Sequence, residues 1–207
     1  MENEAILNNV SRETIKKLEA YQNMVLEWNK NINLISKASE QDIWNRHIID
    51  SLQLYPLIDK KDRRLYDFGS GAGFPAVVLA IVGEDLFPDL AITLVESIGK
   101  KTLFLESVKK TLNLNIDIQR DRIENIRLPK PDVITSRALA SLDKLLDYAE
   151  PFCNKNTKLI FPKGEKWQDE IKHAQKKWVF ECVNIKSITE EKGCILLIKN
   201  IRRTKNG

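Results

Sequence analysis

Residues 65–75 read Leu65-Tyr66-Asp67-Phe68-Gly69-Ser70-Gly71-Ala72-Gly73-Phe74-Pro75 and carry the strongest fold signal in this 207-residue chain. An apolar run leads into three glycines at alternate positions, and an apolar segment follows from about Pro75 to Val82. Glycine permits positive φ and lets a backbone pass close to a ligand. Pro75 suits the first turn of a helix, whose free N–H groups favour an anionic group. The stretch therefore predicts a strand, a ligand-binding turn and a helix in direct succession.

The spacing of these glycines discriminates between cofactors. A dinucleotide fingerprint, G-x-G-x-x-G, requires glycine where this chain has Phe74. The pattern G-x-G-x-G, with Asp67 two residues before Gly69, is instead usual for S-adenosylmethionine. We therefore expect Asp67, Gly69, Gly71 and Gly73 to hold that cofactor. A tight turn with a purely structural role is the alternative that the glycines alone leave open.

Two acids further along the chain favour the cofactor site. Glu96 ends the second apolar run, 23 residues after Gly73, where a doubly wound fold places a carboxylate on ribose hydroxyls. Glu124 follows the third run, where its side chain would line an adenine pocket. Open α/β sheets bind ligands at the carboxyl ends of their strands, and both acids lie there.

The fold class predicted from the remaining pattern is α/β, with a Rossmann-like, mostly parallel sheet of seven strands. Apolar runs spaced by helical patterns indicate right-handed βαβ units. The last two runs are separated only by residues 189–193, which suits a hairpin, so we expect the last strand to be antiparallel. The expected strands are Arg64–Gly69, Ala91–Glu96, Ile116–Gln119, Asp132–Ser136, Lys158–Phe161, Trp178–Ile188 and Gly193–Ile201.

The first 60 residues have a helical pattern instead. Apolar residues recur at three- and four-residue steps from Ile15 to Trp28, and Ser11 followed by Thr14 is typical of a helix start. A second helical pattern runs from about Glu40 to Leu57. We expect residues 1–60 to form a helical extension packed on one compact unit, residues 61–207.

Composition excludes several classes of protein. No apolar run approaches the roughly 18 residues of a membrane span. The acidic start, residues 1–4, lacks the basic and apolar regions of a secretory signal. Three cysteines form no CxxC, and two histidines add no zinc-type spacing. We expect a cytoplasmic protein with no membrane segment and no metal.

Charge is unevenly divided along the chain. Residues 155–207 carry 13 Lys and Arg against 6 Asp and Glu, a net +7, whereas the first 154 residues carry −3 and the whole chain +4. The basic last quarter is a candidate face for a polyanion such as RNA. A solvated tail from Lys199 to Lys205 is the alternative interpretation.

Further sequence blocks carry a family resemblance over nearly the whole chain. The sequence resembles the bacterial small-subunit (16S) ribosomal RNA guanine-N7 methyltransferases, the glucose-inhibited division protein B family. The glycine turn is shared with methyltransferases generally, whereas the blocks at residues 46–52 and 136–138 are more specific to this family. The markers are Trp28-Asn29, Asn33-Leu34, Arg46-His47-Ile48-Ile49-Asp50-Ser51-Leu52, Asp67–Pro75, Leu94-Val95-Glu96-Ser97, Lys100-Lys101, Phe104-Leu105, Thr135-Ser136-Arg137-Ala138 and Lys163-Gly164.

The resemblance implies a class I S-adenosylmethionine-dependent methyltransferase fold. It implies an activity on small-subunit ribosomal RNA or a ribosomal particle, and we expect a monomer. Arg137 is the main candidate for holding RNA phosphate or the purine, and His47 is a second candidate or a structural residue. The cofactor contacts implied by the family fall on Gly69, Phe74, Ile123, Glu124 and Arg137. Candidate RNA contacts are Arg46, Lys100, Lys101 and Lys163.

Two other functions share these features. A methyltransferase for a small molecule or a protein would need the same cofactor residues. A catalytically silent RNA-binding module would keep the fold without the reaction. The lone pair of guanine N7 is free at neutral pH, so the absence of an obvious catalytic base is compatible with the methyltransferase hypothesis.

Overall fold

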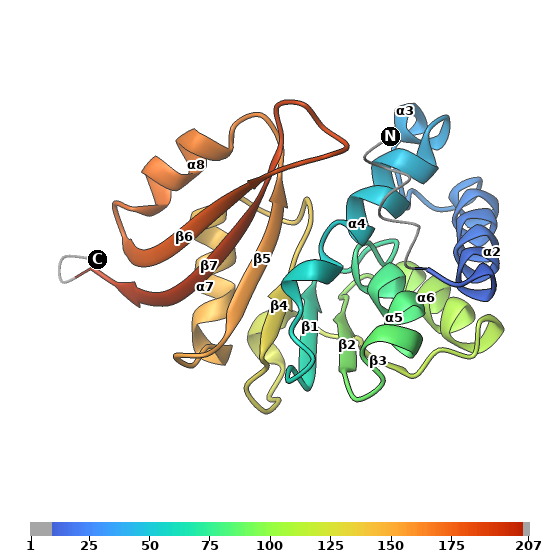
Figure 1. The fold of residues 1–207 in the computed structure, drawn as a ribbon, viewed down its shortest axis with the longest axis horizontal. Helices are drawn as coiled ribbons and strands as arrows, with labels where there is room; N and C mark the ends of the chain where they lie inside the picture. Colours follow the sequence, from blue (N-terminus) through green and yellow to red (C-terminus); the bar gives the residue numbers. More distant parts are fainter. Residues whose placement is uncertain (1–9, 205–207) are drawn as a thin grey trace.

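The computed structural model describes residues 10–204, and its centre is a seven-stranded sheet of order β3-β2-β1-β4-β5-β7-β6 (Figure 1). Only β7 runs antiparallel to its neighbours, β5 and β6, as the sequence predicts. The strands are β1 Arg64–Phe68, β2 Ala91–Val95, β3 Ile116–Gln119, β4 Val133–Thr135, β5 Lys158–Lys163, β6 Trp178–Lys186 and β7 Cys194–Arg203.

Helices cover both faces of this sheet, which buries the near-continuous apolar runs of its parallel strands. One cluster of buried residues joins the sheet to α2, α5 and α6, and a second joins the other face to α7 and α8 (Figure 1). No helix among residues 10–204 is long and apolar enough to cross a membrane. The helices are α2 Arg12–Asn29, α5 Ala76–Leu86, α6 Gly99–Thr111, α7 Leu142–Ala149 and α8 Trp167–Ala174.

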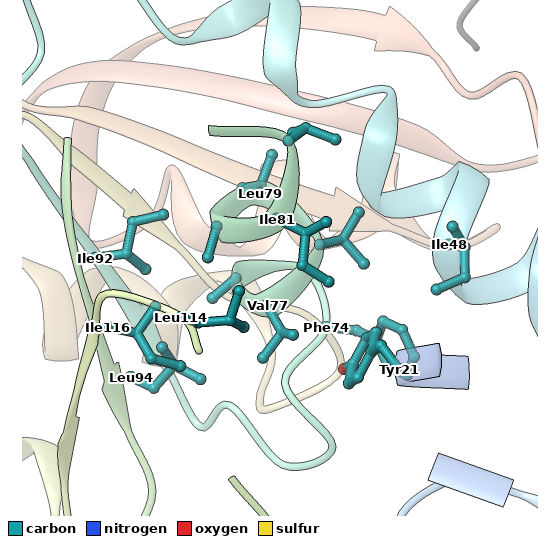
Figure 2. Close-up of a cluster of buried hydrophobic side chains, with 14 of the residues drawn as sticks. Tyr21, Ile48, Phe74, Val77, Leu79, Ile81, Ile92, Leu94, Leu114 and Ile116 are labelled. Atoms are coloured by element: carbon teal, nitrogen blue, oxygen red, sulfur yellow. The ribbon is translucent and has the colours of Figure 1, made fainter. Parts of the chain in front are cut away.

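Helix α5 lies between the sheet and the N-terminal helices. Figure 2 shows its residues Val77 and Ile81 between Leu94 of β2 on one side and Tyr21 and Ile48 on the other. Because the helix is covered on both sides, every residue from Ala76 to Gly83 is buried.

Helix α2 is fixed at its start and along one face. Ser11 is its N-cap, and the Ser11 hydroxyl accepts a hydrogen bond from the Thr14 N–H at 3.1 Å, in agreement with the predicted helix start. Leu18, Tyr21 and Val25 are fully buried in the cluster that holds α5. The helical layer therefore shares its core with the sheet.

The second helical region differs from the single pattern expected over Glu40–Leu57. It is divided into α3 Lys37–Glu40, a π-helix η1 Trp44–Ile49, α4 Asp50–Leu52 and a 3₁₀ turn η2 Tyr55–Leu57. In the π-helix the Asp50 N–H reaches the carbonyl of Asn45, five residues back. Such wide turns are rare and often mark functional sites. Apolar periodicity cannot distinguish them from ordinary helix turns over so short a span.

Residues 60–63 form a charged connector before β1, and a buried ion pair anchors it. The Lys158 Nζ of β5 lies 2.6 Å from Asp62 Oδ2, and both side chains are 6% exposed. The same ammonium donates to the Leu57 carbonyl at 2.9 Å. Three oxygen partners, with Asp59 as the third, compensate the lysine for its lost hydration. The connector is therefore held against the sheet.

Candidate cofactor and substrate site

The turn of residues 69–73, here the glycine turn, joins β1 to α5 as predicted. Its glycines have φ values of +67°, +58° and +95°. A Cβ on Gly73 would lie 2.5 Å from Val77 and 2.9 Å from the Tyr21 hydroxyl, so Gly73 allows close packing of α5 and α2. A Cβ on Gly71 would meet only the Gly69 carbonyl, at 3.8 Å. The backbone at Gly71 therefore faces open space, as a ligand-binding turn requires.

Glu96 follows β2 and lies directly beside this turn. Its side chain is 5% exposed. Its Oε2 accepts the Gly71 N–H at 2.8 Å, and its Oε1 accepts the Ile98 N–H at 2.7 Å. The carboxylate predicted for the ribose is thus fixed by backbone donors at the carboxyl end of the sheet.

Asp67, the penultimate residue of β1, is buried with one oxygen unpartnered. Its Oδ1 accepts the Thr135 hydroxyl at 2.7 Å, whereas Oδ2 has no hydrogen-bond partner among residues 10–204. Burial raises the pKa of Asp67 to about 7, although the hydrogen bond from Thr135 acts in the other direction. An unpartnered carboxylate oxygen beside the glycine turn fits a cationic group, which would supply the missing donor.

Arg137, two residues after β4, is held by the π-helix η1 and by Asp50, the first residue of α4. Its Nη1 donates to the Arg46 carbonyl at 3.0 Å and to Asp50 Oδ2 at 3.1 Å. Its Nη2 contacts His47 Nδ1, and its guanidinium carbon lies 5.2 Å from the centre of the Phe74 ring. We call Arg46, His47, Asp50 and Arg137 the arginine clamp.

His47 is neutral and has a defined tautomer in this arrangement. Burial, reinforced by the charges of Arg137 and Arg46, lowers the pKa of His47 to about 3. A guanidinium can only donate, so Nδ1 accepts from Arg137 and the single proton lies on Nε2. The ring stacks on Phe74 with centroids 4.8 Å apart. His47 is therefore a poor base at neutral pH, and its visible role is to contact Arg137 and Phe74.

A cleft of about 960 Å³ brings the glycine turn and the arginine clamp together. Most of the predicted site residues line it. These are Arg46, His47, Gly69, Gly71, Phe74, Lys101, Arg137 and Lys163. The cleft is also lined by Asp50, by Gln53 and by Thr189 of the β6–β7 connection.

Other predicted residues are not part of this lining, and Asp67, Gly73 and Glu96 are among them. Ile123 is buried and Glu124 exposed in the 3₁₀ turn η3, Ile123–Asn125, which follows β3. Lys100 is exposed on the first turn of α6, beside Lys101. Among residues 10–204, no group of three His, Cys, Asp or Glu side chains is arranged to hold a metal.

Lys163 has partners within the protein. Its Nζ lies 2.7 Å from Glu170 Oε2 and donates to the Ala140 carbonyl at 3.0 Å, and its side chain is 8% exposed. Glu170 also accepts the Leu142 N–H, at the start of α7. Lys163 therefore fixes the loop after β4, whereas Arg46, Lys100 and Lys101 are the more accessible basic candidates.

Leu139 is a cleft residue that sequence reasoning missed. A Cβ on Gly69 would lie 2.5 Å from Leu139 Cδ1, so the leucine packs directly over the glycine turn. The preceding residue, Ala138, has a φ of +55°, which L-residues seldom adopt. Nothing in local periodicity signals a contact between residues 70 positions apart.

Strand order and site together define the Rossmann-like fold of S-adenosylmethionine-dependent methyltransferases. An O-methyltransferase from Bacillus cereus, solved in complex with S-adenosylhomocysteine, matches with a TM-score of 0.60, 14% identity and 96% of each chain covered. The ribosomal protein L11 methylase from Lactobacillus delbrueckii subsp. bulgaricus matches with a TM-score of 0.57 and 16% identity, covering 77% of this chain and 79% of that one.

The chain belongs to the rRNA small subunit methyltransferase G family. The model of that family matches residues 14–198. A relative of that name from Ruegeria sp. (strain TM1040) is 40% identical over 94% of each chain. Another, from Rickettsia bellii (strain OSU 85-389), is 41% identical over 94% of this chain and 97% of its own. The family resemblance in the sequence is therefore confirmed.

Proposed function

We propose that this chain transfers a methyl group from S-adenosylmethionine to N7 of a guanine in small-subunit ribosomal RNA. Family membership and the fold support the reaction class. The observation that carries the cofactor assignment is the unpartnered Oδ2 of buried Asp67 beside the open glycine turn. A purely structural turn would not need a buried carboxylate with a missing donor.

The residues beside the turn fit this cofactor, which carries an ammonium and a sulfonium and supplies an electrophilic methyl group. Asp67 would accept from the ammonium. Glu96, already fixed beside Gly71, would receive the ribose hydroxyls. Ile123 and Glu124 would border the adenine, and the clamp residue Arg137 would hold the carboxylate end or the RNA.

This chain's contribution to the reaction is positioning and charge. Guanine N7 needs no general base, and the low pKa of His47 is consistent with such chemistry. Holding the nucleophile in line with the methyl group accounts for most of the expected acceleration. The carboxylate of Asp50, which lines the cleft, would stabilise the cationic methylated purine electrostatically.

The RNA would approach over the accessible basic residues. Arg46 and Lys101 line the cleft, and Lys100 is exposed beside them. Phosphate contacts release counterions, so RNA binding should weaken as salt rises. We further propose that the enzyme acts as a monomer in the cytoplasm, where ribosomal particles are its substrate.

We also propose that residues 1–60 are an extension of the methyltransferase unit, residues 61–207. The shared core of α2 and α5 supports the packing of this extension on the unit. Residues 1–9 and 205–207, including Lys205 of the basic tail, lie outside the described part of the chain.

The test is methyl transfer from labelled S-adenosylmethionine to small subunits from cells that lack this enzyme. Strand scission selective for N7-methylguanine would locate the label. One cleavage site in the RNA is expected. Label on protein or on a small molecule, with none in RNA, would contradict the proposal and favour another acceptor. Absence of cofactor binding would favour a silent RNA-binding module.

A further inference from the structure

We propose that Asp50 is a positioning residue that fixes the Arg137 guanidinium in the cleft, and that Thr189 of the β6–β7 connection fixes Asp50. This inference rests on the proposed function, because it assigns the guanidinium a place beside a cationic cofactor. It links three segments of the chain that the sequence keeps far apart.

Arg137 has three acceptors, but only one of them carries a charge. The Arg46 carbonyl and the His47 ring nitrogen are neutral, and Asp50 Oδ2 is the carboxylate oxygen. The side chains of Arg137 and Asp50 are 17% and 15% exposed, so the pair is only partly screened by water. Asp50 is therefore the strongest of the three contacts.

Asp50 is itself held from behind. Its Oδ1 accepts the Thr189 hydroxyl and the Gln53 amide, each at 2.7 Å. Gln53 is anchored in turn, because its Oε1 accepts the Ile188 N–H at 3.1 Å. With both oxygens engaged, the carboxylate has one orientation, and that orientation presents Oδ2 to Arg137.

This fixation has a chemical purpose in a site for a cationic cofactor. A free guanidinium in the cleft would repel a sulfonium and an ammonium. Asp50 offsets that charge while leaving the guanidinium over the Phe74 ring and lining the cleft. An ion pair that only joined the helical layer to the sheet would affect stability, but it would not couple to ligand binding.

The first test is a double-mutant cycle on cofactor affinity. Calorimetry with S-adenosylmethionine would compare Asp50→Asn, Arg137→Gln and the double variant. Each single change should weaken binding about tenfold, and the double variant should be no weaker than Arg137→Gln. The matched control is Asp42→Asn, which removes an exposed carboxylate bonded to Asn45 in the same segment. If the losses of affinity from the two single changes multiply in the double variant, the proposal is overturned.

The second test does not depend on the cofactor or the reaction. The chain has two histidines, and ring ¹⁵N spectra resolve His47 from the exposed His173. Release of Arg137 in Asp50→Asn should raise the pKa of His47 and mix its tautomers, as Arg137→Gln should. An unchanged His47 spectrum in Asp50→Asn would overturn the proposal. If the two variants show this histidine response while the wild-type protein transfers no methyl group, the proposed function alone is contradicted.

Discussion

The part of the cleft around the glycine turn is made largely from one stretch of chain, residues 69–74, whereas the arginine clamp joins residues 46–50 to Arg137 and is supported by Thr189. Backbone conformation defines the first region, through three positive φ values. Side-chain hydrogen bonds define the second. One site can therefore contain a part that local sequence predicts and a part that only the complete fold creates.

Breaking the backbone-defined region should have the largest effect. Gly71→Val places a branched side chain at a φ of +58° and fills the open space above the turn. We expect a loss of cofactor affinity of about a hundredfold, because small displacements in a site have large consequences. Calorimetry with S-adenosylmethionine measures it.

The control for this change is Gly83→Ala in α5, where a Cβ would meet nothing within 4 Å. It should leave affinity unchanged and raise stability by about 0.5–1 kcal/mol, since alanine favours helix over glycine. Equal affinity in Gly71→Val and the wild type would remove the glycine turn from the cofactor site.

Acid should weaken cofactor binding through Asp67. Its pKa of about 7 means that protons compete with a cationic ligand for the carboxylate. Affinity should therefore fall as pH drops below about 7, by at most about tenfold per unit. Asp67→Asn should bind more weakly at high pH and lose this dependence. An identical pH profile in both proteins would contradict the assigned contact, and the exposed Asp42→Asn is the control.

The raised pKa of Asp67 also predicts that acid stabilises the cofactor-free protein, although acid weakens cofactor binding. Because the folded state raises the pKa of Asp67 above its unfolded value, the folded state binds the proton more tightly. Stability from this proton is present at low pH and is lost as pH rises through about 7. In thermal melts without cofactor, the Tm of Asp67→Asn relative to that of the wild type should be higher at alkaline pH than at acid pH.

A smaller effect is expected where the helical layer supports the turn. The Tyr21 hydroxyl donates to the Ala72 carbonyl at 2.6 Å. Tyr21→Phe should cost about 1 kcal/mol of stability and also lower cofactor affinity. Tyr66→Phe removes a comparable bond, to the Pro129 carbonyl at 2.7 Å, and should lower stability alone. Equal cofactor affinities in the two variants would show that the contact from α2 does not contribute to cofactor binding by the turn.

The smallest effect should come from Thr189, which supports the clamp residue Asp50. Thr189→Val keeps the shape and removes the donor to Asp50. We expect turnover to fall about threefold, because Gln53 still holds the same oxygen. Thr189→Ser retains the hydroxyl and should restore activity. A serine variant as impaired as the valine variant would indicate a packing role instead.

Sequence reasoning located the elements that depend on local pattern. The seven strands, the antiparallel β7 and the helix start at Ser11 all follow from periodicity and turn residues. The position of Glu96 beside the turn follows from the regular geometry of βαβ units. These features are predictable because each depends on residues close together in the sequence or on the regular geometry of strands and helices.

The remainder depends on contacts that local pattern does not encode. Thr189 and Asp50 are 139 residues apart, and no spacing rule pairs them. Lys163 has the charge of a phosphate contact, yet Glu170 and Ala140 engage it. The π-helix differs from an α-helix by one residue in its hydrogen-bond step, which apolar periodicity cannot resolve.

The placement of β7 between β5 and β6 bears on biosynthesis. A chain emerging from the ribosome has made the glycine turn and Glu96 roughly 100 residues before β7 is available. At ordinary elongation rates that interval is about 5–20 s. Until residues 189–203 are made, Asp50 lacks the hydrogen bond from Thr189, and β5 and β6 lack the strand that joins them. The nascent protein should therefore acquire its cofactor-holding turn first, and the support of the arginine clamp by Thr189 only as translation of these strands ends.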